Sequence, residues 1–195
     1  MRDNPSNGYE AVADGFMKLR SETGAAVVET WAASLPRHAK VLDIGAGHGH
    51  PIAPVLLREG VQLSAIDASA KMVAAFKQKF LDVRVACEAA EESDFFGETF
   101  DAILSVGLIF LLSEKTQIHL LPRMAAALKP KGRLLFSAPK QKCEWIDVLT
   151  GQTSWSLGAD RYEAILKSCG LTVTATHMDA GGSNYYAARK VRAPD

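Results

Sequence analysis

The sequence predicts an α/β fold in which helices cover both faces of a mostly parallel sheet. From Lys40 onward, short apolar segments alternate several times with segments of helical spacing. Such alternation is typical of a parallel sheet with helices on its two sides. The last two extended segments, 171–178 and 184–191, are separated only by Asp-Ala-Gly-Gly-Ser. This turn predicts a closing hairpin, and therefore an antiparallel strand that a plain dinucleotide-binding fold lacks.

Two helices are expected before the alternation begins. In residues 8–20 the apolar positions recur at helical spacing, namely Tyr9, Val12, Ala13, Phe16, Met17 and Leu19. A second helix at 24–35 is ended by Pro36. Since no linker divides the chain, we expect one domain over residues 1–195, with a helical lid at 1–36 on a Rossmann-like core at 37–195.

The alternating region supplies the remaining elements. Its first half contains strands expected at 40–44, 61–66 and 82–86 and helices expected at 51–59 and 69–80. Its second half contains strands expected at 100–105, 133–137, 171–178 and 184–191, helices expected at 114–128 and 160–168, a turn at 129–132 and a loop-rich section at 138–158. Glycines follow two of these helices, where they favour helix termination.

Composition and charge narrow the class of protein. A length of 195 residues suits one domain with a substantial core. The 22 basic and 22 acidic residues balance, so no charge bias indicates a nucleic-acid partner. The polar N-terminus indicates no signal peptide, and the apolar run at 102–112 is too short to span a bilayer. The three separated cysteines indicate neither a disulfide framework nor a metal pair, and we expect a cytosolic protein.

A glycine loop follows the first expected strand in the sequence VLDIGAGHG, residues 41–49. Glycines at this position let the backbone approach a nucleotide at the carboxyl end of the sheet. The loop is not the dinucleotide pattern G-x-G-x-x-G, because His50 stands where the third glycine would be, and it is not a phosphate-binding P-loop. Asp43 precedes the first glycine by two residues and favours a ligand with a cationic end over a pyrophosphate.

VLDIGAGHG resembles motif I of the class I S-adenosylmethionine-dependent methyltransferases. Three further segments support the resemblance in the expected order, namely Asp67 within SAIDAS, FDAILS at 100–105 and LKPKGRLLFSAP at 128–139. The resemblance implies S-adenosylmethionine as the cofactor. It also implies a seven-stranded sheet of order 3-2-1-4-5-7-6 in which strand 7 is antiparallel.

The resemblance assigns the cofactor site residue by residue. Asp67 resembles the acid that binds both ribose hydroxyls, since one carboxylate offers two oxygens. Met72 stands where the family packs a side chain on the adenine, and Glu88 stands at the adenine edge, where an Asp is usual. The cofactor-binding residues that we expect are Asp43, Gly45, Ala46, Gly47, Asp67, Ala68, Met72, Glu88, Ala89, Ser105, Tyr9 and Arg20. For the last two, an apolar stripe position for Tyr9 and a solvated position for Arg20 remain alternatives.

The acceptor pocket is expected in the variable loops. The aromatic candidates are Phe110, Trp145, Trp155 and Tyr185, which suit a flat or cationic acceptor. Asp147 and Asp179 are further candidates because they could steer an amine, and Tyr186 also flanks the closing turn. The alternative is that the aromatic side chains simply cover the sheet. His48 and His50 share the glycine loop, but their spacing gives no metal site, and they either finish a turn or face the acceptor.

The predicted function is transfer of a methyl group from S-adenosylmethionine to a small-molecule acceptor by in-line displacement. This chemistry needs positioning and exclusion of water, with no metal required and no catalytic residue assigned. Two alternatives stay open, a non-catalytic nucleotide-binding module on the same fold and a methyltransferase acting on protein or RNA. An NAD-dependent oxidoreductase is disfavoured by His50 and by the closing hairpin. The sequence does not indicate the acceptor atom or the oligomeric state.

Overall fold

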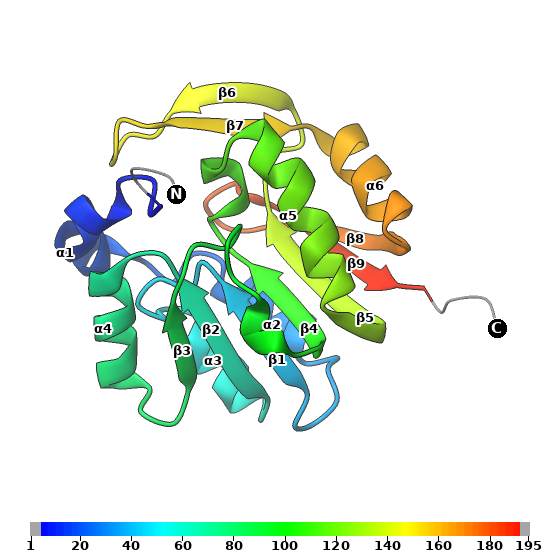
Figure 1. The fold of residues 1–195 in the computed structure, drawn as a ribbon, viewed down its shortest axis with the longest axis horizontal. Coiled ribbons are helices and arrows are strands. Elements are labelled where there is room, and N and C mark those ends of the chain that lie inside the picture. The colour runs from blue at the N-terminus through cyan, green and yellow to red at the C-terminus, as the bar shows by residue number, and fades with distance from the viewer. Residues whose placement is uncertain (1–4, 192–195) are drawn as a thin grey trace.

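The computed structural model describes residues 5–191, which form a mixed sheet flanked by helices (Figure 1). The seven strands of the sheet follow the order β3-β2-β1-β4-β5-β9-β8. Their bounds are β1 Lys40–Ile44, β2 Gln62–Asp67, β3 Arg84–Cys87, β4 Phe100–Ser105, β5 Leu128–Ser137, β8 Leu171–Met178 and β9 Asn184–Lys190. Strands β1 to β5 pair in parallel, and β9 pairs antiparallel with both β5 and β8. The predicted fold class and strand order are therefore confirmed.

Helices cover both faces of the sheet (Figure 1). Their bounds are α1 Tyr9–Leu19, α2 Ala25–Ala32, α3 Ile52–Arg58, α4 Ala70–Lys79, α5 Glu114–Ala126 and α6 Ala159–Ser168, with short 3-10 turns η1 Phe95–Gly97 and η2 Ile109–Leu111. The predicted helices are all present, and their ends differ from the prediction by no more than three residues. Among the described residues, no helix is long and apolar enough to cross a membrane.

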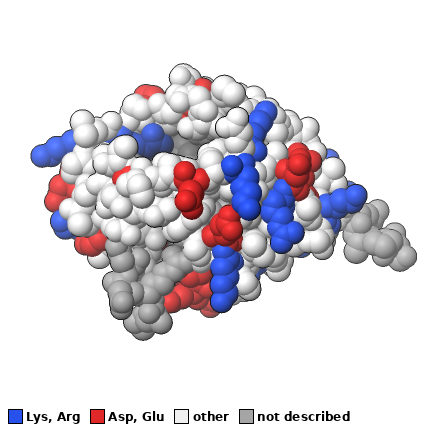
Figure 2. All heavy atoms as spheres, turned by 90° about the horizontal axis from the view of Figure 1, so that it is seen from above, with Lys and Arg blue, Asp and Glu red and all other residues white. Residues whose placement is uncertain are grey.

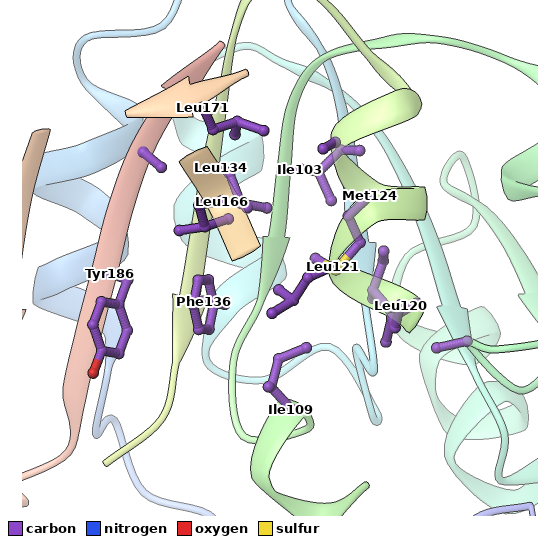
Figure 3. Packing of buried hydrophobic residues seen from close by; sticks show 14 of the residues in the cluster. Ile103, Ile109, Leu120, Leu121, Met124, Leu134, Phe136, Leu166, Leu171 and Tyr186 are labelled. Carbon is purple, nitrogen blue, oxygen red and sulfur yellow. The ribbon is translucent and has the colours of Figure 1, made fainter. Parts of the chain in front are cut away.

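Successive residues of the central strands feed two separate hydrophobic cores, because side chains alternate between the faces of a sheet. Leu134 and Phe136 of β5 pack with α5 and α6, whereas Leu135 between them packs with α2 and α3. Figure 3 shows the first core, with Leu121 and Met124 of α5 directed toward these strand residues. The parallel strands are apolar on both faces because helices cover both faces.

The chain order reverses at β1, which lies between β2 and β4. In a parallel sheet, the loops that leave two such neighbouring strands diverge to opposite faces and leave a crevice at the carboxyl edge. Residues 45–51 leave β1 and residues 106–113 leave β4 at this point. The sheet topology therefore places a ligand crevice beside the glycine loop.

The expectation of a loop-rich section at 138–158 was wrong. Residues Lys142–Ile146 and Thr153–Leu157 form β6 and β7, an antiparallel hairpin that stands apart from the main sheet (Figure 1). The buried positions of β7 include Ser154 and Ser156. Because these buried residues are polar, the apolar alternation that marks a half-buried strand is missing from the sequence.

The expected start of the fifth strand was also wrong. β5 begins at Leu128, which pairs with Phe100, and the next pair joins Arg133 to Ala102. The residues between them form a bulge in which Lys131 has a φ of 66°. The Lys-Pro-Lys-Gly turn signal is therefore real, but it interrupts the strand and does not precede it.

Candidate functional site

A cavity lies at the carboxyl edge of the sheet, beside the glycine loop and under α1. It brings together eleven of the residues predicted to contact cofactor or acceptor, namely Tyr9, Arg20, Gly45, Gly47, Asp67, Ala68, Met72, Glu88, Phe110, Asp179 and Tyr185. Eight predicted residues do not line it, namely Asp43, Ala46, Ala89, Ser105, Trp145, Asp147, Trp155 and Tyr186. The cavity also includes Phe16 and Thr23, for which the sequence carries no motif, and Ser137, which lies within the segment LKPKGRLLFSAP but was not predicted as a site residue.

The surface seen in Figure 2 carries acidic and basic side chains in mixed order, with much of the face uncharged. No extended patch of one sign is visible on this face. A nucleic-acid partner requires a concentration of positive charge, which this face lacks.

The glycine loop is held against the end of β2 by its own backbone. The N–H groups of Gly45 and Ala46 both donate to Ile66 O, at 2.9 and 3.1 Å. At Gly45, a Cβ would lie 2.8 Å from Leu108 Cβ, so glycine is needed for packing. At Gly47, whose φ is 57°, a Cβ would have no atom within 4 Å and would project into open space at the cavity wall. Gly47 therefore leaves room for a ligand.

The carboxylate of Asp67 is fixed at the cavity wall by two backbone N–H groups. Gly47 N donates to Oδ2 and Ser69 N donates to Oδ1, both at 2.8 Å. Burial raises the pKa of Asp67, while these two hydrogen bonds act in the opposite direction. Each carboxylate oxygen has a second lone pair, so the pair of oxygens can accept two further hydrogen bonds from a ligand in the cavity.

Asp43 lies behind the loop and is almost fully buried, with 1% of its surface exposed. Its Oδ2 has no hydrogen-bond partner within residues 5–191. Burial is the main cause that raises the pKa of Asp43 to about 7, and the negative charge of Asp67 adds to the effect. A buried carboxylate without a cation or a donor is costly, so this oxygen is suited to a cationic group brought by a ligand.

Helix α1 is fastened on both sides of the cavity. On the side of α4, Glu10 Oε2 accepts from Ser69 Oγ at 2.5 Å and from Lys71 N at 3.2 Å. On the other side, the Tyr9 hydroxyl donates to Asp147 Oδ2 at 3.3 Å, just after β6. The sequence motifs indicate Tyr9 but not Glu10, because the contact between Glu10 and α4 joins segments far apart in the chain.

Arg20 follows α1 and lines the cavity, but its guanidinium turns back to its own loop. Its two terminal nitrogens donate to Ser21 O at 3.4 Å and to Thr23 O at 3.2 Å. The five N–H donors of a guanidinium exceed these two bonds, so capacity for an anionic ligand group remains.

On the far side of the cavity, Phe110 and Tyr185 provide aromatic surface. Trp145 does not reach the cavity, but its ring packs on Phe110 at 5.6 Å between centroids. The Trp155 carbonyl accepts from Gln117, which anchors β7 to α5. Tyr186 lies in the hydrophobic core, stacked on Phe136 (Figure 3). The alternative that aromatic residues cover the protein interior is thus correct for Tyr186.

Two serines, of which only Ser105 was predicted as a site residue, support the loops from behind. Ser105 is fully buried, and its hydroxyl donates to Ile44 O at 3.0 Å, which ties the end of β4 to the end of β1. The following loop is tied in the same way, because Gly107 N donates to Ser137 Oγ at 2.8 Å. These bonds fix the backbone that the cavity exposes at Val106 and Gly107.

Neither histidine of the glycine loop lines the cavity. His48 is 2% exposed and meets the ring of Phe16 edge-on at 6.3 Å between centroids. Burial lowers its pKa to about 4, so the imidazole is neutral. His50 Nε2 lies 3.1 Å from Glu22 Oε1. No group of three or more metal-ligating side chains occurs within the described part of the chain.

Comparisons with known proteins agree with this geometry. Residues 41–132 match the model of a methyltransferase domain family. A search of curated proteins finds no significant relative. The family match confirms the resemblance seen in the glycine loop and in the strands that follow.

Several solved structures share the fold over nearly the whole chain. One is the 1,6-didemethyltoxoflavin-N1-methyltransferase of Burkholderia thailandensis, solved with its acceptor and S-adenosylhomocysteine (TM-score 0.78, 23% identity, 96% of this chain and 87% of that one). Another is an amino pentose methyltransferase of Micromonospora echinaspora with bound S-adenosylmethionine (TM-score 0.71, 17% identity, 94% of this chain and 96% of that one). The cyclase SpnF also has the fold (TM-score 0.70, 16% identity, 87% of this chain and 82% of that one). At these identities the likeness establishes the fold, and the activity must be argued from the site.

Proposed function

We propose that this chain transfers a methyl group from S-adenosylmethionine to a small-molecule acceptor. The chain matches a methyltransferase domain at 41–132 and has the fold of class I S-adenosylmethionine-dependent methyltransferases. The observation that carries the proposal is the carboxylate of Asp67. It is oriented by Gly47 N and Ser69 N at the wall of the cavity and keeps two lone pairs for a vicinal diol.

The residues present fit the cofactor at four places. Asp67 would accept from the ribose hydroxyls, and Gly47 leaves open space beside it. The unpartnered oxygen of Asp43 would stabilise the positive end of the cofactor. Met72 and Glu88, which line the same cavity, would contact the adenine. Arg20 would bind the carboxylate of the methionine moiety through its remaining donors.

The bound cofactor supplies a sulfonium methyl group that is already activated for displacement. The contribution of the chain is therefore positioning and exclusion of water. The loop after β4 is fixed by Ser105 and Ser137, and α1 covers the cavity through Glu10 and Tyr9. We propose that residues 1–36 form a lid over a core of residues 37–195 within one domain.

The acceptor side supports a small molecule. The cavity continues past Val106 and Leu108 to Phe110 and Tyr185, which would surround an acceptor with apolar and aromatic surface. The Burkholderia thailandensis structure, in which a small heterocycle and S-adenosylhomocysteine are bound together, is a precedent for such an arrangement. A cytosolic location, expected from three cysteines that carry no disulfide, stays a prediction.

Calorimetric titration tests the proposal. We expect the wild-type chain to bind S-adenosylmethionine and S-adenosylhomocysteine, and to bind NAD not at all. Asp67→Ala should reduce the affinity for both by at least about tenfold, because two charge-assisted hydrogen bonds are lost. The matched control is Asp82→Ala, an exposed residue just before β3 at the opposite edge of the sheet. No binding by the wild-type chain, or equal loss in both variants, would refute the proposal.

The cyclase SpnF shows that this fold hosts activities other than methyl transfer, and a non-catalytic nucleotide-binding module is the alternative to the proposed function. Incubation of the chain with methyl-labelled S-adenosylmethionine and a cell extract separates the possibilities. Label in small molecules supports the proposed function, and label in protein or RNA supports a macromolecular acceptor. Cofactor binding without any labelled product supports the module.

A further inference from the structure

Asp179 and Tyr185 form a hydrogen-bonded pair on the acceptor side of the cavity. The Tyr185 hydroxyl donates to Asp179 Oδ2 at 2.9 Å, and both residues line the cavity. Tyr185 belongs to β9, and Asp179 begins the turn that joins β8 to β9. The cofactor assignments above use neither residue.

The turn holds the carboxylate of Asp179 in place. Its Oδ1 accepts from Gly181 N and from Ser183 N, both at 2.9 Å. The backbone closes the same turn, since Asp179 N donates to Ser183 O at 3.0 Å. A carboxylate fixed by two N–H groups and one hydroxyl cannot turn away from the cavity without breaking hydrogen bonds.

The pair lies next to the loop that follows β4. Tyr185 pairs with Ser137 in the sheet, and Ser137 Oγ accepts from Gly107 N. A Cβ placed on Gly24 would lie 2.6 Å from Tyr185 Oη and 3.7 Å from Val106 Cγ1, so the hydroxyl and Val106 are close to the same point. This arrangement places Tyr185 beside the loop that follows β4, on the side of the sheet away from Asp67.

The charge at this wall is not neutralised by an ion pair. Within residues 5–191, the ion pairs found in the structure do not include Asp179. Arg20 is the cation among the cavity residues, and it is bonded to Ser21 O and Thr23 O. A fixed carboxylate in a cavity that is also lined by apolar residues such as Val106 and Phe110 favours a positively charged or N–H-bearing partner and disfavours an anionic one.

We propose that Asp179 binds the amino group of the acceptor, so that the substrate class of this methyltransferase is a small amine with an apolar or aromatic flank. The proposal rests on the proposed function. Tyr185 is a positioning residue that holds the second carboxylate oxygen, and Phe110 with Leu108 contacts the flank of the amine.

The chemical step balances with Asp179 as the proton acceptor. An ammonium group must lose one proton before its nitrogen has a lone pair. In the proposed step that proton passes to the Asp179 carboxylate. The nitrogen then forms a bond to the methyl carbon as the carbon–sulfur bond breaks, and sulfur keeps the electron pair. The product is a methylated ammonium, and Asp179 returns its proton to solvent.

Matched probes of one shape and different charge test the proposal without knowledge of the natural acceptor. The wild-type chain is first saturated with S-adenosylhomocysteine and then titrated with benzylamine, benzyl alcohol or benzoate. We expect benzylamine to bind about tenfold more tightly than benzoate, as fits a charge contact in a partly shielded site. In Asp179→Asn this preference should disappear, while the affinity for S-adenosylhomocysteine stays unchanged.

Two further variants separate recognition from folding. Asparagine at position 179 keeps an oxygen for Gly181 N and Ser183 N, so the turn is retained. Tyr185→Phe should weaken benzylamine binding less than Asp179→Asn does. Asp82→Asn changes the net charge equally at the opposite edge of the sheet and should keep the preference.

The outcomes are distinct from those of the proposed function. Failure of the wild-type chain to bind S-adenosylhomocysteine refutes the proposed function itself. Binding of S-adenosylhomocysteine without binding of benzylamine, a preference for benzoate, or a preference that survives in Asp179→Asn refutes the amine assignment alone.

Discussion

Tyr9 and Asp147, which are 138 residues apart in the sequence, are joined beside the cavity by a hydrogen bond of 3.3 Å. The contact ties the first turn of α1 to the loop of the β6–β7 hairpin. Burial is the main cause that raises the pKa of Tyr9 well above its ordinary value, and the carboxylate of Asp147 adds to the effect. The Tyr9 hydroxyl therefore keeps its proton and stays a donor. The hairpin therefore helps to hold the leading helix, whose residues Tyr9 and Phe16 line the cavity and cover it.

Tyr9→Phe should loosen this cover without unfolding the protein. The variant loses one hydrogen bond, worth about 1 kcal/mol, and Asp147 keeps its bonds to Leu149 N and Thr150 N. We expect faster amide hydrogen exchange in the segment around α1 and faster release of S-adenosylhomocysteine. Hydrogen exchange by mass spectrometry measures the first and stopped-flow displacement the second. Unchanged exchange in α1 would contradict the closure described here.

The two glycines of the loop should respond differently to alanine. Gly47→Ala places a methyl group in open space at the cavity wall. Its backbone cost is about 1 to 2 kcal/mol, and its main effect should be weaker binding of S-adenosylhomocysteine. Gly45→Ala adds a collision with Leu108 to a similar backbone cost and should lower the melting temperature further. Thermal unfolding without ligand, compared with calorimetry, distinguishes the two. Equal melting temperatures would argue against the packing role of Gly45.

Asp43→Asn should stabilise the empty protein and weaken binding of S-adenosylmethionine. The folded-state pKa of about 7 lies above the ordinary value of 3.8, so the folded state binds the extra proton between these values. Stability from this group is therefore lost as the pH rises through about 7, at roughly 1.4 kcal/mol for each pKa unit. The variant should be more stable than wild type at pH 8 and similar at pH 4. Denaturant unfolding at both pH values measures this, and a variant less stable at pH 8 would contradict it.

His48→Gln should change the acid sensitivity of the fold. Burial lowers the pKa of His48 from 6.5 to about 4, so the unfolded state binds more protons between these values. The contribution of His48 to stability is therefore full above about pH 6.5 and declines as the pH falls toward 4. The difference in unfolding free energy between wild type and variant should shrink over that interval. The titration of Asp43 changes the unfolding free energy in the opposite direction over part of this pH interval. The wild type and His48→Gln should therefore be compared twice, once with Asp43 present and once in the Asp43→Asn background.

The parts of the fold that were predictable from the sequence depend on local patterns. The glycine loop, Asp67 and the strand ends lie within short segments whose residue types and spacing carry the information. β1, β4 and β8 were predicted with their observed bounds, the first two from short apolar segments and β8 from its apolar alternation. The ring of Tyr186 was less predictable, since adjacent strand residues face opposite sides and a one-residue shift in register reverses them.

The rest depends on contacts between distant segments. Glu10 and Ser69 are 59 residues apart, and neither belongs to a motif that indicates their bond. The β6–β7 hairpin was missed because its buried positions include serines. The Ser156 hydroxyl donates to Pro139 O, whereas Ser154 Oγ has no hydrogen-bond partner within the described residues. Trp145 was placed in the acceptor pocket on residue type alone, whereas it supports Phe110 from behind.

Because the chain order reverses at β1, the two walls of the cavity come from two successive portions of the chain. The wall that carries Gly47, Asp67, Met72 and Glu88 comes from one continuous portion of the chain, and the wall that carries Phe110, Asp179 and Tyr185 comes from a later one. The crossover point lies between β3 and β4, where no residue of the main cavity is contributed between Glu91 and Val106. A chimera joined in this interval would inherit its donor specificity from one parent and its acceptor specificity from the other, so the two can diverge independently.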